Sequence, residues 1–192
     1  INHIKPFAAL EDCLMMKVDN YFTAGERNGE KVEGFDLGNS PFEYMDEKLK
    51  GKNIAFTTTN GTQAIAKSLA ARDIIIGSFL NLTSVADYLR EHATQVLVVC
   101  AGWKGKVCLE DTLFAGALVS ALKDEFTPCC DSPMMAQTLY EGVKHDLPGA
   151  LKNASHVKRL NKLDIHKDIV FCLTPDQYKI VPRLVDGVLC VM

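Results

Sequence analysis

Residues 52–73, KNIAFTTTNGTQAIAKSLAARD, carry the pattern that decides the fold. An apolar run, NIAF, is followed by the small polar or flexible residues TTTNGT at 57–62, and then by apolar residues at helical spacing. This order predicts a strand over residues 53–59, a tight connection, and a helix over residues 62–72. The stretch is therefore a strand-to-helix unit of the kind that builds an α/β protein.

The same alternation of short apolar runs and helical patterns continues along the chain. Further strands are expected at residues 2–7, 21–26, 73–79 and 95–102. Further helices are expected at residues 8–17, 41–50, 83–92, 110–126, 134–145, 153–163 and 168–173. The run at 96–101 lacks polar alternation, which is typical of a strand covered on both faces. Asp186-Gly187 stands between two apolar arms and predicts a C-terminal β-hairpin.

Length and composition are those of an ordinary globular protein. The 192 residues include 47% hydrophobic and 23% charged residues, which favours a single domain over residues 1–192. A net charge of -3 argues against a nucleic-acid partner, and the apolar runs are too short to cross a membrane. Seven cysteines, several inside apolar runs, indicate free thiols rather than a disulfide framework. We therefore expect a soluble cytoplasmic protein.

Polar residues gather directly after the expected strands, and ligands of α/β sheets bind beyond the carboxyl ends of strands. Three such clusters are present: Glu26, Arg27, Asp36, Asn39 and Ser40; Thr57, Thr58, Thr59, Asn60, Gly61 and Thr62; and Glu110 with Asp111. Amides at a helix start attract anions, and threonine hydroxyls add donors. Carboxylates are the ligands that Mg²⁺ prefers. The clusters predict a site for a phosphorylated anion and a divalent metal, whereas the five histidines show no zinc-ligand spacing.

Each cluster has an alternative, purely structural interpretation. TTTNGT is equally explained as a strand end in which Thr62 caps the helix. Glu110 and Asp111 would complement a helix dipole, and Ser40 with Pro41 is a helix start in its own right. Arg27 would form a surface ion pair with a neighbouring glutamate. Sequence spacing alone leaves these alternatives open.

Several motifs, in this order and at these intervals, give the chain a resemblance to a known family. They are GER at 25–27, EGFDLGNSP at 33–41, TTTNGTQA at 57–64, AG at 101–102, LEDTLFAG at 109–116, and the helical stretch SHVKRL at 155–160. Together they resemble the 2-phosphosulfolactate phosphatase family of coenzyme M biosynthesis. The combination of EGFDLGNSP with TTTNGT is specific, whereas GER or AG alone is not.

The resemblance implies a three-layer α/β/α sandwich around a mixed or mostly parallel sheet. It also implies Mg²⁺-dependent hydrolysis of (2R)-2-phospho-3-sulfolactate to sulfolactate and phosphate, and a homodimer or larger assembly. It further implies one more strand and a D-x-L-R-A-T-S-like segment before the position of Ile1, so we expect these 192 residues to be N-terminally incomplete.

On this basis the candidate residues receive hypothetical roles. The expected catalytic residues are Glu26, Arg27 and Asp111. The expected substrate-binding residues are Asn39, Ser40, Thr59, Asn60, Gly61 and Thr62. The expected metal ligands are Asp36, Glu110 and Asp111. No phosphate loop of the C-x₅-R type surrounds Cys100 or Cys108, so direct attack by water is favoured over a phosphocysteine.

Two other functions remain as alternatives. The chain could act on another small phosphorylated acid, which a substrate panel would reveal, or bind anions without catalysis. A thiol-redox role through Cys129 and Cys130 ranks last.

Overall fold

The computed structural model describes residues 1–160 and 166–191. These residues form two compact units, the first made of Ile1–Ile75 together with the chain from Pro182 onward, and the second of Ile76–Val181. Each unit is described by itself below. The expectation of a single domain stays a prediction.

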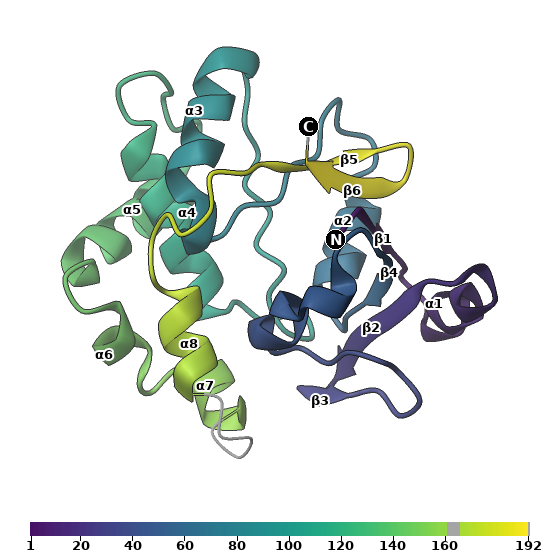
Figure 1. Cartoon of the computed structure of the whole chain (residues 1–192). Coiled ribbons are helices and arrows are strands. Elements are labelled where there is room, and N and C mark those ends of the chain that lie inside the picture. The colour runs from purple at the N-terminus through teal and green to yellow at the C-terminus, as the bar shows by residue number, and fades with distance from the viewer. Residues whose placement is uncertain (161–165, 192) are drawn as a thin grey trace. The chain divides into compact units, whose positions relative to one another are not determined.

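The first unit is built on a six-stranded mixed sheet, seen in Figure 1, with the order β3-β2-β4-β1-β6-β5. Its strands are β1 (His3–Pro6), β2 (Phe22–Arg27), β3 (Glu30–Lys31), β4 (Asn53–Thr57), β5 (Pro182–Val185) and β6 (Val188–Val191). Strand β4 runs parallel to β1 and β2, whereas β3, β5 and β6 pair antiparallel with their neighbours. Gly25 lies opposite Thr57 in this register, so β2 and β4 end at the same edge of the sheet.

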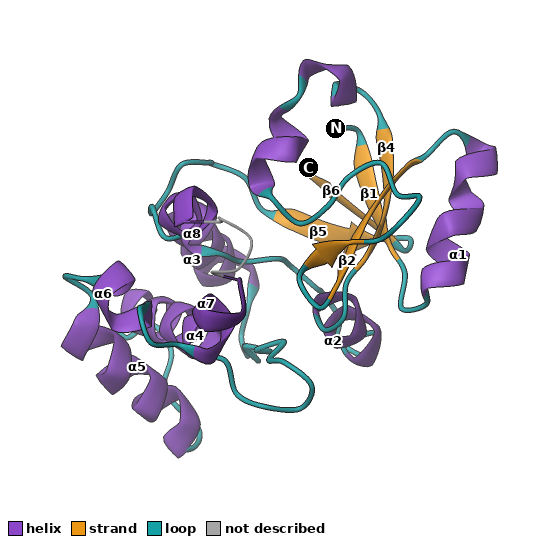
Figure 2. Cartoon of the chain, turned by 90° about the horizontal axis from the view of Figure 1, so that it is seen from below, coloured by secondary structure: helices purple, strands orange, loops and turns teal. Residues whose placement is uncertain are grey.

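Alternating side chains of β4 pack on the two faces of this sheet. Ile54 packs in one cluster with Ala24, Leu37 and Leu49, and Ala55 packs in the other with Cys13 and Phe35. Helix α1 (Leu10–Met15), continued by the 3₁₀ helix η1 (Met16–Asp19), supplies the second cluster, and Figure 2 shows α1 beside the strands. The 3₁₀ helices η2 (Pro41–Met45) and η3 (Glu47–Leu49) supply the first. The sheet is therefore covered on both faces, and α2 (Gly61–Lys67) follows β4.

The second unit is helical where it is described. Its elements are η4 (Phe79–Asn81), α3 (Leu82–His92), α4 (Leu109–Ala121), α5 (Asp131–Val143), α6 (Leu147–Leu151), α7 (Ser155–Leu160) and α8 (His166–Cys172). Helix α4 packs mainly against α5, beside which it lies in Figure 1. Gly116 permits this close approach, because a Cβ atom there would lie 2.0 Å from the carbonyl oxygen of Ala136. Fully buried Leu113 anchors the core between α4 and its neighbours.

The α/β class and the C-terminal hairpin of β5 and β6 are confirmed. Two expected strands are wrong. Residues 73–79 form only an isolated bridge from Ile75 to Arg183, and residues 95–102 form no strand, with Leu97 86% exposed. Apolar composition indicates a tendency to be buried, but a strand also needs a hydrogen-bonding neighbour, which the local sequence does not specify.

Smaller differences concern helix type and boundaries. The helix expected at 41–50 is two 3₁₀ helices, because Asp46 is extended and its carboxylate accepts the N–H of Lys48 to begin a second short turn. Strand β3 and helix α6 were not expected. The part of the expected 153–163 helix beyond residue 160 lies outside the described residues. Among the residues that are described, no helix has both the length and the apolar character needed to cross a bilayer.

Candidate active site

Glu26 organises the polar edge of the first unit at the ends of β2 and β4. Its Oε1 accepts the N–H of Thr59 at 2.8 Å, and its Oε2 accepts the N–H of Gly29 at 2.8 Å. Both carboxylate oxygens are thus engaged by backbone donors. Glu26 therefore ties the connection after β4 to the turn after β2.

Arg27 and the threonines of TTTNGT also bond within this edge. Arg27 donates from Nη1 to the carbonyl oxygen of Glu26 at 2.7 Å and from Nη2 to Oγ1 of buried Thr57 at 3.1 Å. Thr62 donates its N–H to Oγ1 of Thr58 at 3.2 Å and its hydroxyl to the carbonyl oxygen of Thr58 at 3.0 Å. Thr58 and Thr62 thus bond to each other across the start of α2, but the N-cap residue is Asn60 and not Thr62, the residue expected to cap the helix.

Thr59 differs from these neighbours. Its Oγ1 is buried and has no hydrogen-bond partner among the described residues. A buried hydroxyl without a partner is costly, so it marks a position at which a ligand or water would add stability. Asn60 is the N-cap residue of α2, and Gly61 is the first residue of that helix.

Asp36 bonds to Thr23, in the first half of β2. Its Oδ2 accepts both the N–H and the hydroxyl of Thr23 at 2.8 Å, and Lys17 lies 3.6 Å from its Oδ1. Burial alone would raise the pKa of Asp36, but the bonds from Thr23 and the charge of Lys17 lower it below the ordinary value. Thr23 stands in the first half of β2, so Asp36 is not brought to the edge that holds Glu26.

Asn39 and Ser40 follow a short parallel pairing. Leu37 bridges to Ala24 in the parallel sense, so the chain continues from there toward the carboxyl end of β2. Ser40 is the N-cap residue of η2, and its side chain makes no capping bond. The register therefore carries Asn39 and Ser40 toward the edge formed by Glu26 and Arg27.

The second unit contains a separate polar cluster at the start of α4. Glu110, in the first turn of α4, accepts a short hydrogen bond at Oε1 from Nδ1 of His156 on α7. The second carboxylate oxygen, Oε2, is buried and has no partner in the described part of the chain. Burial by itself would raise the pKa of Glu110, but the bond and charge of His156 lower it.

Asp111 stands beside Glu110 with the opposite titration behaviour. Its Oδ2 accepts the N–H of Gly102 at 2.7 Å, across the turn in which Trp103 and Lys106 pair. Burial raises the pKa of Asp111 above its ordinary value, and the charge of Glu110 adds to this against the bond from Gly102. Gly102 is required here, since it has φ +64° and a Cβ would lie 2.5 Å from the carbonyl oxygen of Lys106.

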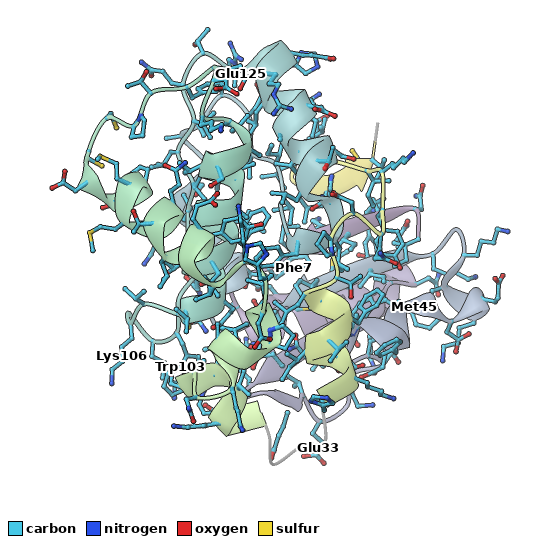
Figure 3. The ribbon with its side chains drawn as sticks, turned by 90° about the vertical axis from the view of Figure 1, so that its left-hand side faces the viewer. Phe7, Glu33, Met45, Trp103, Lys106 and Glu125 are labelled. Atoms are coloured by element: carbon cyan, nitrogen blue, oxygen red, sulfur yellow. The ribbon has the colours of Figure 1, made fainter. Side chains whose placement is uncertain are left out.

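Arg159 completes the cluster from α7. Its guanidinium carbon lies 3.8 Å from the ring centroid of Trp103, within stacking distance. Its Nη2 is buried and has no hydrogen-bond partner among residues 1–160 and 166–191. Figure 3 shows Trp103 and Lys106 close together at their turn.

Cys108, the N-cap residue of α4, is buried next to Glu110. Burial, followed by the charges of Glu110 and Asp111, raises the pKa of its thiol to about 11. A thiol that stays protonated at neutral pH is a poor nucleophile. The geometry therefore favours attack by water over a phosphocysteine.

The donor atoms at the start of α4 suit a divalent cation. Cys108, Glu110 and His156 offer ligand atoms that lie within 4.8 Å of one another. Of these three, only Glu110 offers the oxygen that Mg²⁺ prefers, through its unpartnered Oε2, whereas a thiolate and an imidazole suit Zn²⁺ better. A cation would also relieve the repulsion between Glu110 and Asp111. Glu110 thus has an oxygen open to Mg²⁺, whereas at Asp36 the Oδ2 atom accepts two hydrogen bonds from Thr23 and Oδ1 lies 3.6 Å from Lys17 Nζ.

Three residues of this cluster were missed as functional candidates in the sequence: His156, Arg159 and Trp103. The signal available for the first two was the stretch SHVKRL, which carried family resemblance but no assigned role. Trp103 stands between the AG and LEDTLFAG motifs. Its contact with Arg159 joins distant parts of the chain, which no local pattern reveals.

The fold and these clusters define a class: an α/β protein in which partly buried acids and an arginine gather at the start of one helix. Comparison with known proteins makes this specific. The family model for 2-phosphosulpholactate phosphatase matches residues 1–187. The chain belongs to the 2-phosphosulfolactate phosphatase family, whose members are hydrolases.

Individual relatives agree with this assignment. The "Probable 2-phosphosulfolactate phosphatase" of Thermotoga maritima is 45% identical over 183 residues, covering 95% of this chain and 79% of the relative. Relatives with the same name from Caldanaerobacter subterraneus subsp. tengcongensis and Synechocystis sp. are 44% and 37% identical, covering 88% and 97% of this chain and 71% and 81% of their own.

Proposed function

We propose that this chain hydrolyses (2R)-2-phospho-3-sulfolactate to sulfolactate and inorganic phosphate with Mg²⁺, as a step of coenzyme M biosynthesis. The observation that carries the proposal is the cluster at the start of α4. There, buried oxygen and nitrogen atoms of Glu110 and Arg159 lack partners within the described chain. An anionic substrate and a cation are the groups that would complete such a cluster.

Glu110 and Asp111 would hold the metal ion, which when bound neutralises phosphoryl charge and orients the substrate. His156 fixes the carboxylate of Glu110 through its Nδ1 bond. Burial raises the pKa of Asp111 while no ion is bound, but as a ligand its carboxylate would be ionised, so the proton for the leaving oxygen would come from water. A water molecule attacks phosphorus and leaves one proton on the released phosphate. The bond between phosphorus and the ester oxygen breaks, and that oxygen takes up a proton to become the hydroxyl of sulfolactate. Positioning and electrostatics supply most of the catalysis.

The polar edge of the first unit is proposed as an anion-binding edge in its own right. Arg27, with the groups of Thr59, Asn60, Gly61 and Thr62, would contact a phosphate, sulfonate or carboxylate group, and Asn39 and Ser40 extend toward the same edge. Glu26 would act mainly by holding Thr59 in place, because both of its oxygens already accept backbone N–H groups. The alternative for this edge is a structural role alone.

The surroundings of the protein are also proposals. A cytoplasmic location and a homodimer are what the family resemblance implies. The expected partner is a small anionic substrate, not a nucleic acid, given the net charge of -3.

A substrate panel tests the proposed activity. Phosphate release would be measured from phosphosulfolactate and from phospholactate, which lacks the sulfonate, with Mg²⁺ and with EDTA. We expect EDTA-sensitive turnover that prefers the sulfonated compound. Preference for the carboxylated compound would support a phosphatase for another small acid. Saturable binding without phosphate release from either compound would overturn the enzymatic proposal in favour of an anion-binding protein.

A further inference from the structure

We propose that Arg159, stacked on Trp103, forms an oxyanion subsite in the second unit that binds a tetrahedral phosphoryl or sulfonate group through its Nη2. The role of this subsite in catalysis rests on the proposed function. Its existence as a binding site rests only on the contacts of Arg159 itself.

One nitrogen of Arg159, Nη2, is a buried hydrogen-bond donor that makes no hydrogen bond within the described chain. Arginine keeps its charge at any physiological pH, so burial of this nitrogen cannot be relieved by loss of a proton. Buried charged donors without an acceptor are rare because their desolvation is costly. An anionic ligand is the acceptor that would remove this cost.

Among the described residues, the acids near Arg159 bond to other partners. The carboxylate of Glu110 is bonded to His156 instead, and Asp111 accepts from Gly102. No ion pair links Arg159 to an acid in residues 1–160 and 166–191, although its charge lowers the pKa of Cys108 against the larger effect of burial. The guanidinium of Arg159 thus lies near Glu110 and Cys108 and forms no ion pair with an acid among the described residues.

The ring of Trp103 orients the guanidinium of Arg159. The face of Trp103 lies against the guanidinium at 3.8 Å, and Lys104 Nζ lies over the same ring at 4.7 Å. Stacking fixes the plane of the guanidinium, so less side-chain freedom is lost when it binds. The two cations also give the turn a local positive charge. A planar fork held in this way matches two oxygens of a tetrahedral anion.

Trp103 provides a direct reporter, because it is the sole tryptophan of the sequence. Trp103 fluorescence would be recorded while the full-length chain is titrated with inorganic phosphate and, separately, with methanesulfonate. We expect a saturable change with each anion that binds. Tighter binding of phosphate assigns the subsite to the phosphoryl group, and tighter binding of methanesulfonate assigns it to the sulfonate. Absence of any saturable change would overturn the proposal.

Variants separate the specific contribution of Arg159 to anion binding from the effect of any nearby positive charge. Arg159→Gln should raise the dissociation constant at least about tenfold, the loss expected for a charge-assisted hydrogen bond. Arg159→Lys should restore only part of the affinity, since an ammonium lacks the planar fork that stacks on the ring and presents two parallel donors. The matched control is Lys158→Gln, which removes a neighbouring exposed cation of α7 and should leave binding within about a factor of two, as for a rim charge. Equal effects of the Arg159→Gln and Lys158→Gln changes would overturn the proposal.

Turnover assays keep this inference distinct from the proposed function. If the protein releases no phosphate and yet binds anions in an Arg159-dependent way, the subsite stands and the enzymatic proposal falls. If phosphosulfolactate is hydrolysed with the same KM by wild type and by folded Arg159→Gln protein, the subsite falls and the enzymatic proposal stands. Circular dichroism and urea unfolding of the variant establish that it is folded.

Discussion

The polar edge of the first unit and the polar cluster of the second are alike in composition but differ in how many of their polar atoms are hydrogen-bonded: at the edge, Thr59 Oγ1 is the one side-chain atom that is buried without a partner among the described residues. Around Glu26, both carboxylate oxygens and most threonine groups of TTTNGT bond to neighbours in the same unit. Around Glu110, a carboxylate oxygen and a guanidinium nitrogen are buried without partners in the described residues. Polar residues that satisfy one another hold the fold, whereas those left incomplete indicate where a ligand binds.

The largest expected effect is on catalysis by the incomplete cluster. Glu110→Gln keeps the shape of the side chain and removes its charge, so phosphate release should fall by at least about 100-fold, the scale of losing a catalytic carboxylate. The measurement is kcat/KM for phosphosulfolactate. Glu141→Gln, which changes an exposed acid of α5, is the control and should retain activity. A Glu110→Gln protein with near wild-type turnover would remove the cluster from the mechanism.

Asp111→Asn should raise the stability of the fold at neutral pH and lower the activity. The pKa of Asp111 is raised in the folded protein, so between the ordinary value of 3.8 and that raised value the folded state binds more protons than the unfolded state. Stability contributed by Asp111 therefore decreases as pH rises through this window. Asparagine still accepts the N–H of Gly102 but carries no charge.

Asp111→Asn should accordingly unfold at a higher temperature than wild type at pH 7, lose this difference near pH 3, and release phosphate at least about tenfold more slowly. Thermal unfolding at several pH values and phosphate release test both parts. A lower unfolding temperature at pH 7 would show that the charge of Asp111 stabilises the fold, against this account.

Substitutions at two threonines of the first unit compare a hydrogen-bonded hydroxyl with an unpartnered one. Thr62→Val removes a buried hydroxyl that bonds to Thr58, and should lower the free energy of unfolding by about 1–3 kcal/mol. Thr59→Val replaces an unpartnered buried hydroxyl by a methyl group, and should leave the free energy of unfolding unchanged or raise it by about 1 kcal/mol. Urea unfolding measures both. Equal losses for the two variants would mean that Thr59 has a structural partner after all.

The smallest effect is expected at Cys108. Since burial and nearby acids raise the pKa of this thiol to about 11, it is protonated at neutral pH. Cys108→Ala should keep kcat within about a factor of three of wild type, because a protonated thiol is not the nucleophile. Trapping of a phosphorylated Cys108 during turnover would instead establish the covalent route.

The sequence was a sufficient guide where the determinants are local. TTTNGT follows β4 and opens α2, and Glu110 and Asp111 stand in the first turn of α4, as the apolar spacing predicted. The same reasoning failed for residues 95–102, because their apolar character does not specify a strand partner. The assignment of Asp36 as a metal ligand stays a prediction; in the structure its Oδ2 accepts two hydrogen bonds from Thr23.

The partners of the candidate site were beyond local patterns. His156 reaches Glu110 across 46 positions of the sequence, and Arg159 reaches Trp103 from the same short helix. Such contacts depend on how α7 packs beside the start of α4, which periodicity within one segment cannot specify. Saturation of hydrogen bonds is likewise a property of the folded chain alone.

Hydrogen exchange with the reaction product tests the central claim most directly. Backbone amide exchange of the full chain would be compared with and without sulfolactate, phosphate and Mg²⁺, peptide by peptide. The account predicts the clearest slowing in residues 102–112 and 155–159, which carry Asp111, Glu110, His156 and Arg159. Unchanged exchange in both segments, with slowing confined to other parts of the chain under saturating ligand, would contradict it.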